Sequence, residues 1–449
     1  MNKILIANRG EIARRIIRTC NELGIETVAI HSEADGDLPY VSEATESVLI
    51  GPNPVVQSYL QGDKIIEAAK QHGAEAIHPG YGLLSENAEF ARKVEEAGLV
   101  FIGPSADIIE KMGDKIESRR TMIEAEVPVV PGTENGVETL EEAIKEAEAI
   151  GYPIMLKASA GGGGIGMVRC DSEQALSQQF LSVKNRAKAY FGDDIVFLEK
   201  FLPNARHIEV QIFGDHQGNI VHLFERNCSV QRRNQKVIEE SPSPNLPQDV
   251  REKLCAAAIQ AAKAVGYTNA GTVEFIVDEN NDFYFLEMNT RLQVEHPVTE
   301  QVTGFDLVEW QVKIANGETL LPQEQIKSSG HAIEFRIYAE DPKTFFPSPG
   351  TLEKIIWGQE ARIESGYEQG NTVTPFYDPM ISKIIITGDD RVDALRKSQN
   401  FFNHATITGV KTNIPLFHEF IESREFVSGE YATSTLPKWM EKSKEEQGL

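Results

Sequence analysis

The sequence predicts an α/β protein, with a parallel α/β region first, a mixed α+β region in the middle and a β-rich region last. Three observations predict this order. Strand-like and helix-like patterns alternate over residues 1–111, which is typical of a parallel sheet. The pattern changes at Met112, and a β-rich segment with several prolines begins at Gly330. A chain of 449 residues is long enough for two or three hydrophobic cores.

The first elements follow from the spacing of apolar residues. Lys3–Ala7 predicts a strand, and apolar residues then recur at helical spacing up to Gly24. A strand over Glu26–His31 follows. Further along, we expect helices over 63–72 and 86–97 and strands over 76–77 and 100–103. Ligands usually bind at the carboxyl ends of parallel strands, so the loops 8–10 and 78–82 are candidate sites, with ordinary turns as the alternative.

The middle region contains the most glycine-dense segment of the chain, Gly161–Gly164. Its flanks predict strands over 154–158 and 167–170, so it fits neither a P-loop nor a dinucleotide fingerprint, both of which open a helix. It predicts a flexible hairpin tip whose amides close over phosphates, with a purely structural loop as the alternative. Lys157, just before it, favours an anionic ligand. Around this segment we expect a helix over 140–150 and strands over 195–201 and 207–214.

Two alternating strands joined by a polar turn near Asn280 and Asn281 carry the strongest chemical pattern. They place Glu274 opposite Glu287 on one face of a hairpin. Because like charges repel there, the pattern favours a hard divalent cation between the carboxylates, with Asn289 as a further oxygen ligand. Two solvated surface glutamates are the alternative.

A polar segment over 290–297 follows this hairpin directly. Arg291 is placed to hold a planar anion by a two-pronged contact, and Glu295 is placed to act as a general base; a salt-bridged loop is the alternative. Upstream, residues 231–236 form a basic island in a protein of net charge -24. That charge repels nucleic acid and anionic membranes, so we expect any bound phosphate to be held by a local cluster.

The apolar runs and the cysteines limit the class of protein. No run approaches the roughly 20 apolar residues of a membrane span, and the N-terminus turns polar after five residues. We therefore expect a soluble, cytoplasmic protein without a signal peptide. The four cysteines lie far apart and form no CxxC pair, which predicts reduced structural thiols.

Six phrases together resemble one family, the biotin carboxylases of the ATP-grasp superfamily. In the family's order and spacing, the chain contains IANRGEIA, IHPGYGLLSEN, KASAGGGGIGM, QRRNQKV, EMNTRLQVEHPVTE and FYDPMISK. The resemblance covers nearly the whole chain. It implies an N-terminal α/β (pre-ATP-grasp) domain over 1–111, an ATP-grasp domain over 112–330 with a mobile glycine-rich lid over about 129–201, and a C-terminal biotin carboxylase domain over 331–449.

The resemblance also assigns roles to individual residues. It implies ATP contacts from Lys115, Lys157, Gly163, Gly164, Glu199, Lys200, Phe201, Leu202, His207, Gln231, Asn234, Glu274 and Glu287. It implies magnesium ligands at Glu274, Glu287 and Asn289, a bicarbonate pocket of Lys236, Arg291, Gln293 and Val294, a general base at Glu295, and a biotin site at Tyr81 and Arg336. Two positions depart from many family members: Asn234 where histidine is common, and Ile165 where a basic residue is common.

The implied chemistry is phosphoryl transfer from ATP to bicarbonate, followed by carboxylation of biotin. Mg²⁺ is the expected metal, with Mn²⁺ as a substitute. The expected partners are a separate biotin carboxyl carrier protein, carboxyltransferase subunits of an acetyl-CoA or acyl-CoA carboxylase, and a second copy of the chain in a homodimer. The sequence contains no Ala-Met-Lys-Met-like turn, and a polar tail of residues 432–449 is shorter than the roughly 70 residues of a carrier domain. We therefore expect biotin to be a substrate that is not covalently attached to this chain.

Two rival functions stay open from the sequence. One is a different ATP-grasp ligase that uses another acylphosphate, against which residues 291–295 and the C-terminal segment argue. The other is a nucleotide-binding subunit without catalysis, against which the full set of motif-matched residues argues. Bicarbonate-dependent ATP hydrolysis that biotin stimulates distinguishes the three.

Overall fold

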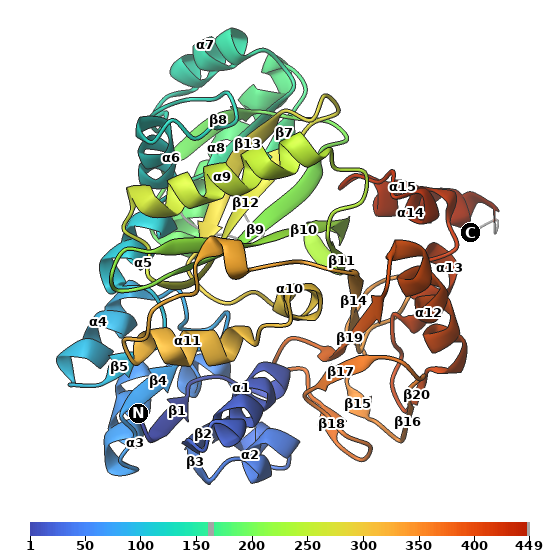
Figure 1. The fold of residues 1–449 in the computed structure, drawn as a ribbon. Helices are drawn as coiled ribbons and strands as arrows, with labels where there is room; N and C mark the ends of the chain where they lie inside the picture. The colour runs from blue at the N-terminus through green and yellow to red at the C-terminus, as the bar shows by residue number, and fades with distance from the viewer. Residues whose placement is uncertain (160–165, 447–449) are drawn as a thin grey trace.

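The computed structural model describes residues 1–159 and 166–446. Figure 1 shows the N-terminal region in blue, the region of α7 and α8 in green at the opposite end, and the C-terminal region in orange and red to one side. Residues 160–165 lie outside the described part, and with them Gly163, Gly164 and Ile165. Among the described helices, none is long and apolar enough to cross a membrane.

The N-terminal region is a five-stranded parallel sheet in the order β3-β2-β1-β4-β5, as the alternating pattern predicts. Its elements are β1 (Lys3–Ile6), α1 (Gly10–Glu22), β2 (Glu26–Ser32), η1 (Glu33–Asp35), α2 (Pro39–Glu43), β3 (Glu46–Gly51), η2 (Val55–Gln57), α3 (Gly62–Gln71), β4 (Ala76–His78), α4 (Ala88–Glu96) and β5 (Val100–Phe101). Helix α4 begins two residues later than predicted because the Asn87 side chain caps it by accepting from Phe90 N. The edge strand β3 was not predicted, and it is mostly exposed or half-buried, with Leu49 56% exposed.

A small unit with its own core follows. Its elements are α5 (Ala106–Gly113), α6 (Lys115–Glu124), α7 (Leu140–Ile150), β6 (Ile154–Ala158), β7 (Met167–Cys170), α8 (Glu173–Phe191) and β8 (Val196–Lys200). The antiparallel sheet β7-β6-β8 packs against α7 and α8 around Leu156 and Phe180. The predicted helix over 140–150 and the strands on both sides of the glycine segment are confirmed.

The centre of the molecule is an eight-stranded antiparallel sheet in the order β13-β12-β9-β10-β11-β14-β19-β17. Its strands are β9 (Arg206–Gly214), β10 (Ile220–Arg232), β11 (Gln235–Ser241), β12 (Asn269–Val277), β13 (Phe283–Asn289), β14 (His331–Tyr338), β17 (Arg362–Ser365) and β19 (Met380–Gly388). Helix α9 (Gln248–Ala264) packs along β9 and β10, and α10 (His296–Thr303) and α11 (Leu307–Ala315) lie between this sheet and the N-terminal region (Figure 1). The β-rich region after Gly330 therefore continues this sheet, because β11 pairs with β14.

The last region adds short strands and helices around the end of this sheet. They are η3 (Gln323–Gln325), β15 (Gly350–Thr351), β16 (Lys354–Ile356), β18 (Thr372–Val373), α12 (Arg391–His404), β20 (Thr406–Thr408), α13 (Ile414–Phe420), α14 (Arg424–Ser428) and α15 (Thr435–Glu446). The tail after Tyr431 was expected to be only polar chain, but it contains α15. Leu436 is buried, and the Trp439 ring packs edge-on against Phe420 at 5.3 Å. Leu436 and Trp439 thus pack the otherwise polar helix α15 against the rest of the protein.

Candidate active site

The β12–β13 hairpin has the predicted register. Glu274 lies directly opposite Glu287, and Thr272 lies opposite Asn289. The turn uses Asn281 at a φ of +66°, which asparagine tolerates better than most residues. A register shift follows Glu274, so the ladder is interrupted beside this acidic pair before it continues to Val277 and Phe283.

The two hairpin glutamates differ in their surroundings. Glu274 Oε1 accepts from Lys236 Nζ at 3.0 Å, and its Oε2 lies 2.8 Å from His207 Nε2. Burial alone would raise the pKa of Glu274, but Lys236 and His207 outweigh it and lower that pKa below its ordinary value. Burial and the Glu274 charge raise the pKa of Glu287, and Lys115 offsets only part of this rise. The cationic groups near Glu287 therefore stabilise its charge less than Lys236 and His207 stabilise the charge of Glu274.

Glu295 is completely buried and held by two cations. Its Oε1 accepts from Lys236 Nζ at 2.7 Å, and its Oε2 accepts from Arg336 Nη2 at 3.0 Å. Burial acts to raise the pKa of Glu295, but Lys236, Arg336 and Arg226 hold it well below its usual range. Glu295 is therefore ionised, which a general base requires, and the same cations that ionise it also weaken it as a base.

Lys236 connects the hairpin to Glu295. Its ammonium contacts Glu274 and Glu295, and it also donates to Glu209 Oε2 at 2.7 Å. Glu209 was missed by the sequence reasoning. It is fully buried, lies opposite Glu274 on the neighbouring strand and pairs with Arg226 at 2.5 Å. A carboxylate at an inward position of a strongly alternating strand was the available signal.

Some buried side chains have ligand atoms close enough together to bind one metal ion, and these side chains were not all predicted as ligands. Among the described residues, one such set is His207, Glu209 and Glu274, and another is Glu209, Cys228 and Glu295. Glu287 belongs to neither. The predicted ligands Glu274 and Glu287 are paired across the hairpin, and His207 and Glu209 have donor atoms close to those of Glu274.

The segment after the hairpin is fixed by Arg291. This guanidinium donates to Asn289 Oδ1 and Gln293 Oε1, each at 2.7 Å, and to Glu86 Oε2 at 2.7 Å. Gln293 Nε2 in turn donates to Glu274 at 3.1 Å. Three predicted residues are therefore brought together by direct contact. Glu86, from the loop before α4, was not predicted to take part.

The residues expected to contact nucleotide come from α6, from the small β6–β8 sheet and from the central sheet. Lys157 and Arg119 both pair with Glu199. Burial lowers the pKa of Lys115 near Glu287. Lys200 Nζ donates to the carbonyls of Gly151 and Tyr152. The Arg169 guanidinium lies over the Phe201 ring, and Leu202 follows Phe201 in the chain. Gln231 Nε2 lies 2.8 Å from His207 Nδ1, and Asn234 lies in the β10–β11 turn. The side chains of Glu199 and Lys200 are thus already occupied by protein partners.

A cavity of about 450 Å³ contains both predicted biotin contacts. Tyr81, Arg336 and Val294 line it, and the Tyr81 hydroxyl hydrogen-bonds to Glu11. Arg336 therefore touches Glu295 on one side and the cavity on the other.

Two further groups behind this cavity were missed. Lys383 is fully buried, donates to Val294 O at 2.8 Å and lies 3.1 Å from Glu11 Oε2. Glu239 forms an ion pair with Arg336. Burial raises the pKa of Glu239 to about 7, although Arg336 acts against the rise. Its cross-strand neighbour Glu334 is also fully buried, and neither of its oxygens has a hydrogen-bond partner among the described residues.

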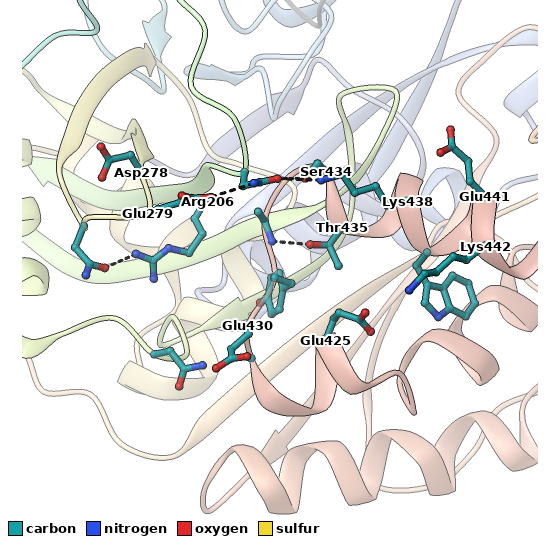
Figure 2. A pocket seen from close by; sticks show the side chains of 17 residues that line it. Arg206, Asp278, Glu279, Glu425, Glu430, Ser434, Thr435, Lys438, Glu441 and Lys442 are labelled. Atoms are coloured by element: carbon teal, nitrogen blue, oxygen red, sulfur yellow. Dashed lines mark hydrogen bonds between the residues drawn. The ribbon is translucent and has the colours of Figure 1, made fainter.

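A larger cleft, of about 810 Å³, lies elsewhere between β9, the β12–β13 turn and helices α14 and α15. Figure 2 shows that most of its side chains are polar or charged. Arg206 Nη2 donates to Asn281 Oδ1 at 2.5 Å, and Lys438 Nζ donates to Asn204 Oδ1 at 3.0 Å (Figure 2). It is lined by none of the residues that the sequence predicts to be functional.

Comparison with family models accounts for nearly the whole chain. The biotin carboxylase N-terminal domain matches residues 1–109, the ATP-binding domain of the carbamoyl-phosphate synthase L chain matches 114–323, and the biotin carboxylase C-terminal domain matches 334–438. Biotin carboxylase 2 of Bacillus subtilis is 56% identical over 97% of this chain and 98% of its own length. This chain belongs to the biotin carboxylase family. The resemblance and the fold expected from the sequence are thereby confirmed.

Solved structures of the family show the same fold. A biotin carboxylase complex from Campylobacter jejuni is 46% identical and superposes with a TM-score of 0.96 over 97% of this chain and 98% of its own. The biotin carboxylase domain dimer of the Hydrogenobacter thermophilus 2-oxoglutarate carboxylase, solved with MgADP, ADP and bicarbonate, is 47% identical with a TM-score of 0.94 over 97% of each chain. Some relatives are longer: this chain spans 60% of the α subunit of Arabidopsis thaliana methylcrotonoyl-CoA carboxylase, at 52% identity.

Proposed function

We propose that this enzyme uses ATP and bicarbonate to carboxylate biotin carried on a separate protein. The observation that carries the proposal is the position of Glu295. This ionised carboxylate is shared between Lys236, which touches the acidic hairpin, and Arg336, which lines the cavity. A phosphoryl-transfer site and a biotin site are thereby joined through one buried base. Membership of the biotin carboxylase family supports the same reaction.

The donor set of the hairpin fits magnesium. Glu274, Glu287 and Asn289 offer hard oxygen ligands from two adjacent strands, and substrate phosphates would complete the shell. The raised pKa of Glu287 reflects burial and repulsion by Glu274, and a divalent cation would relieve this repulsion. Magnesium, or manganese in its place, would neutralise charge on the transferred phosphoryl group. Lys115 and Lys157 are assigned to the phosphates of ATP.

Bicarbonate is assigned to the segment that begins at Arg291. Lys236, Arg291, Gln293 and Val294 would orient it, and Glu295 would take the proton from its hydroxyl. A bicarbonate oxygen then bonds to the γ-phosphorus as the bond to ADP breaks, which gives carboxyphosphate. Because Arg291 is already fixed by three contacts, it needs little reorganisation to hold this anion.

Biotin is assigned to the cavity of Tyr81 and Arg336. Carboxyphosphate would break into carbon dioxide and phosphate there, the phosphate would take the ureido proton, and the ureido nitrogen would bond to carbon dioxide. Arg336 would stabilise the negative charge on the ureido oxygen as a fixed cation. Water would have to be kept from the unstable intermediate, and closure of the predicted lid would do this.

The assembly belongs to the proposal as well. We assign a biotin carboxyl carrier protein and carboxyltransferase subunits as partners, a homodimer as the oligomer and the cytoplasm as the location. The dimeric 2-oxoglutarate carboxylase domain supports the homodimer.

The decisive experiment measures ATP hydrolysis and carboxylation in parallel. The enzyme is expected to hydrolyse ATP only with Mg²⁺ and bicarbonate, to be stimulated by biotin, and to transfer label from bicarbonate to biotin. Magnesium-dependent ATP hydrolysis that ignores both bicarbonate and biotin would contradict the proposal.

A further inference from the structure

The mouth of the biotin cavity has an exposed apolar rim. Two loops form it, 52–57 from the N-terminal region and 375–378 from the C-terminal region. Val55 and Phe376 line the cavity itself. The exposed apolar residues around them, which we call the rim patch, are Pro52, Pro54, Val56, Pro375 and Phe376.

The rim patch gathers apolar side chains beside the cavity of an acidic protein. The Val56 side chain is 58% exposed and Phe376 is 47% exposed, although the chain carries a net charge of -24. Within loops 52–57 and 375–378, Asp378 is the charged residue, and it stands at the wall of the cavity. Exposed apolar groups gathered beside a binding site are typical of a protein contact surface.

The two loops are held in fixed relation. The Tyr377 hydroxyl donates to Asn53 O at 2.6 Å and lies 2.6 Å from Ser32 Oγ. The Arg9 guanidinium stacks over the Tyr377 ring at 4.2 Å, and Asp35 anchors Arg9 at 2.6 Å. A surface built from two distant segments is therefore presented as one preorganised unit, which lowers the entropy cost of binding.

We propose that the rim patch is the docking surface for the carrier protein that presents biotin. This inference rests on the proposed function. Biotin attached to a protein side chain enters the cavity by its mouth, which brings the protein around the attachment point close to the rim. The rim offers apolar side chains, and the matching surface of the carrier is therefore apolar around its biotinylated lysine.

The test separates tethered from free biotin. Val56→Asp places a charge in the rim patch, and Val392→Asp is the matched control because Val392 is 75% exposed on α12, which packs against β19. The substrates are the biotinylated carrier domain of a bacterial biotin-dependent carboxylase and free biotin. We expect Val56→Asp to lower kcat/KM for the carrier about tenfold through KM, and to change kcat/KM for free biotin less than about twofold. Val392→Asp is expected to change neither.

Each other outcome overturns the inference in a distinct way. An unchanged carrier KM in Val56→Asp would show that the carrier docks elsewhere. Equal losses for carrier and free biotin would show that Val56 acts on the cavity. Wild-type enzyme that carboxylates neither substrate would overturn the proposed function itself. Val56→Lys, with the opposite charge, keeps the test valid if Val56→Asp does not fold, because an apolar contact loses affinity with either charge.

Discussion

The cleft beside α15 and the cavity at Arg336 differ in size and in the kind of residue around them. The cleft has about 810 Å³ and the cavity about 450 Å³, yet of the two only the smaller is lined by predicted functional residues, namely Tyr81, Val294 and Arg336. In the cleft, polar groups meet one another near solvent (Figure 2). Behind the cavity, Glu295, Lys383 and Glu334 are buried at 0% exposure. Burying charged groups costs free energy, so a cluster of buried charges is typical of a functional site. The buried charges therefore indicate the predicted reactive site better than the volume of a cavity does.

The largest expected effect is at Arg336, where the cavity meets the base. Arg336→Ala is expected to reduce biotin carboxylation by a factor on the order of a hundred or more, the usual scale for one preorganised oxyanion partner. Some bicarbonate-dependent ATP hydrolysis should survive, because Lys236 still holds Glu295. Parallel assays of both activities check this, with thermal unfolding to confirm the fold. Equal losses in both would move Arg336 into the phosphoryl-transfer step.

The acidic hairpin is expected to be almost as sensitive. Glu287→Gln keeps the shape but removes one of the two facing carboxylates, so ATP hydrolysis should fall by about ten- to a hundredfold and require more Mg²⁺. Titration of the ATPase with Mg²⁺ measures this. Glu279→Gln, in the turn of the same hairpin, is the control. Unchanged magnesium dependence would show that the hairpin does not hold the metal.

Glu239 provides a pH-dependent measurement of the buried cluster. Its pKa is raised from 4.5 to about 7, so the folded state binds its proton more tightly than the unfolded state does. The resulting stability is fully present below 4.5 and is lost as the pH rises through about 7. Wild type should therefore lose roughly 1–3 kcal/mol relative to Glu239→Gln between about pH 4.5 and 8. Urea unfolding at both pH values measures the difference, and a constant difference would show that Glu239 is ionised throughout.

The smallest effect is expected in the large cleft. Arg206→Gln removes a half-buried cation that donates to Asn281, and it should leave kcat and KM for ATP and biotin within about twofold. Steady-state kinetics check this. A loss of carboxylation activity as large as that of Arg336→Ala would show that the large cleft is as important for catalysis as the cavity.

Much of this site was predictable because its signals are local. The register that places Glu274 opposite Glu287 follows from a period-2 pattern on both sides of a short turn. Contacts between distant segments could not be derived in this way. Lys383 reaches Val294 across 89 residues, and Glu86 reaches Arg291 across 205. Sequence spacing gives the face of an element, but only the packing of whole regions determines which faces meet.

The continuity of the central sheet also limits how this enzyme can move. Strands β11 and β14 pair over four residues, from Ile238 opposite Phe335 to Ser241 opposite Ala332. Lys236 and Arg336, the two cations on Glu295, are therefore mounted on neighbouring strands of one stiff body. We therefore expect any hinge to lie outside this body, and the β6–β8 unit, which has a separate sheet and core, is the predicted moving part. If this unit opens for nucleotide exchange, we expect the distance between Glu295 and Arg336 to stay unchanged.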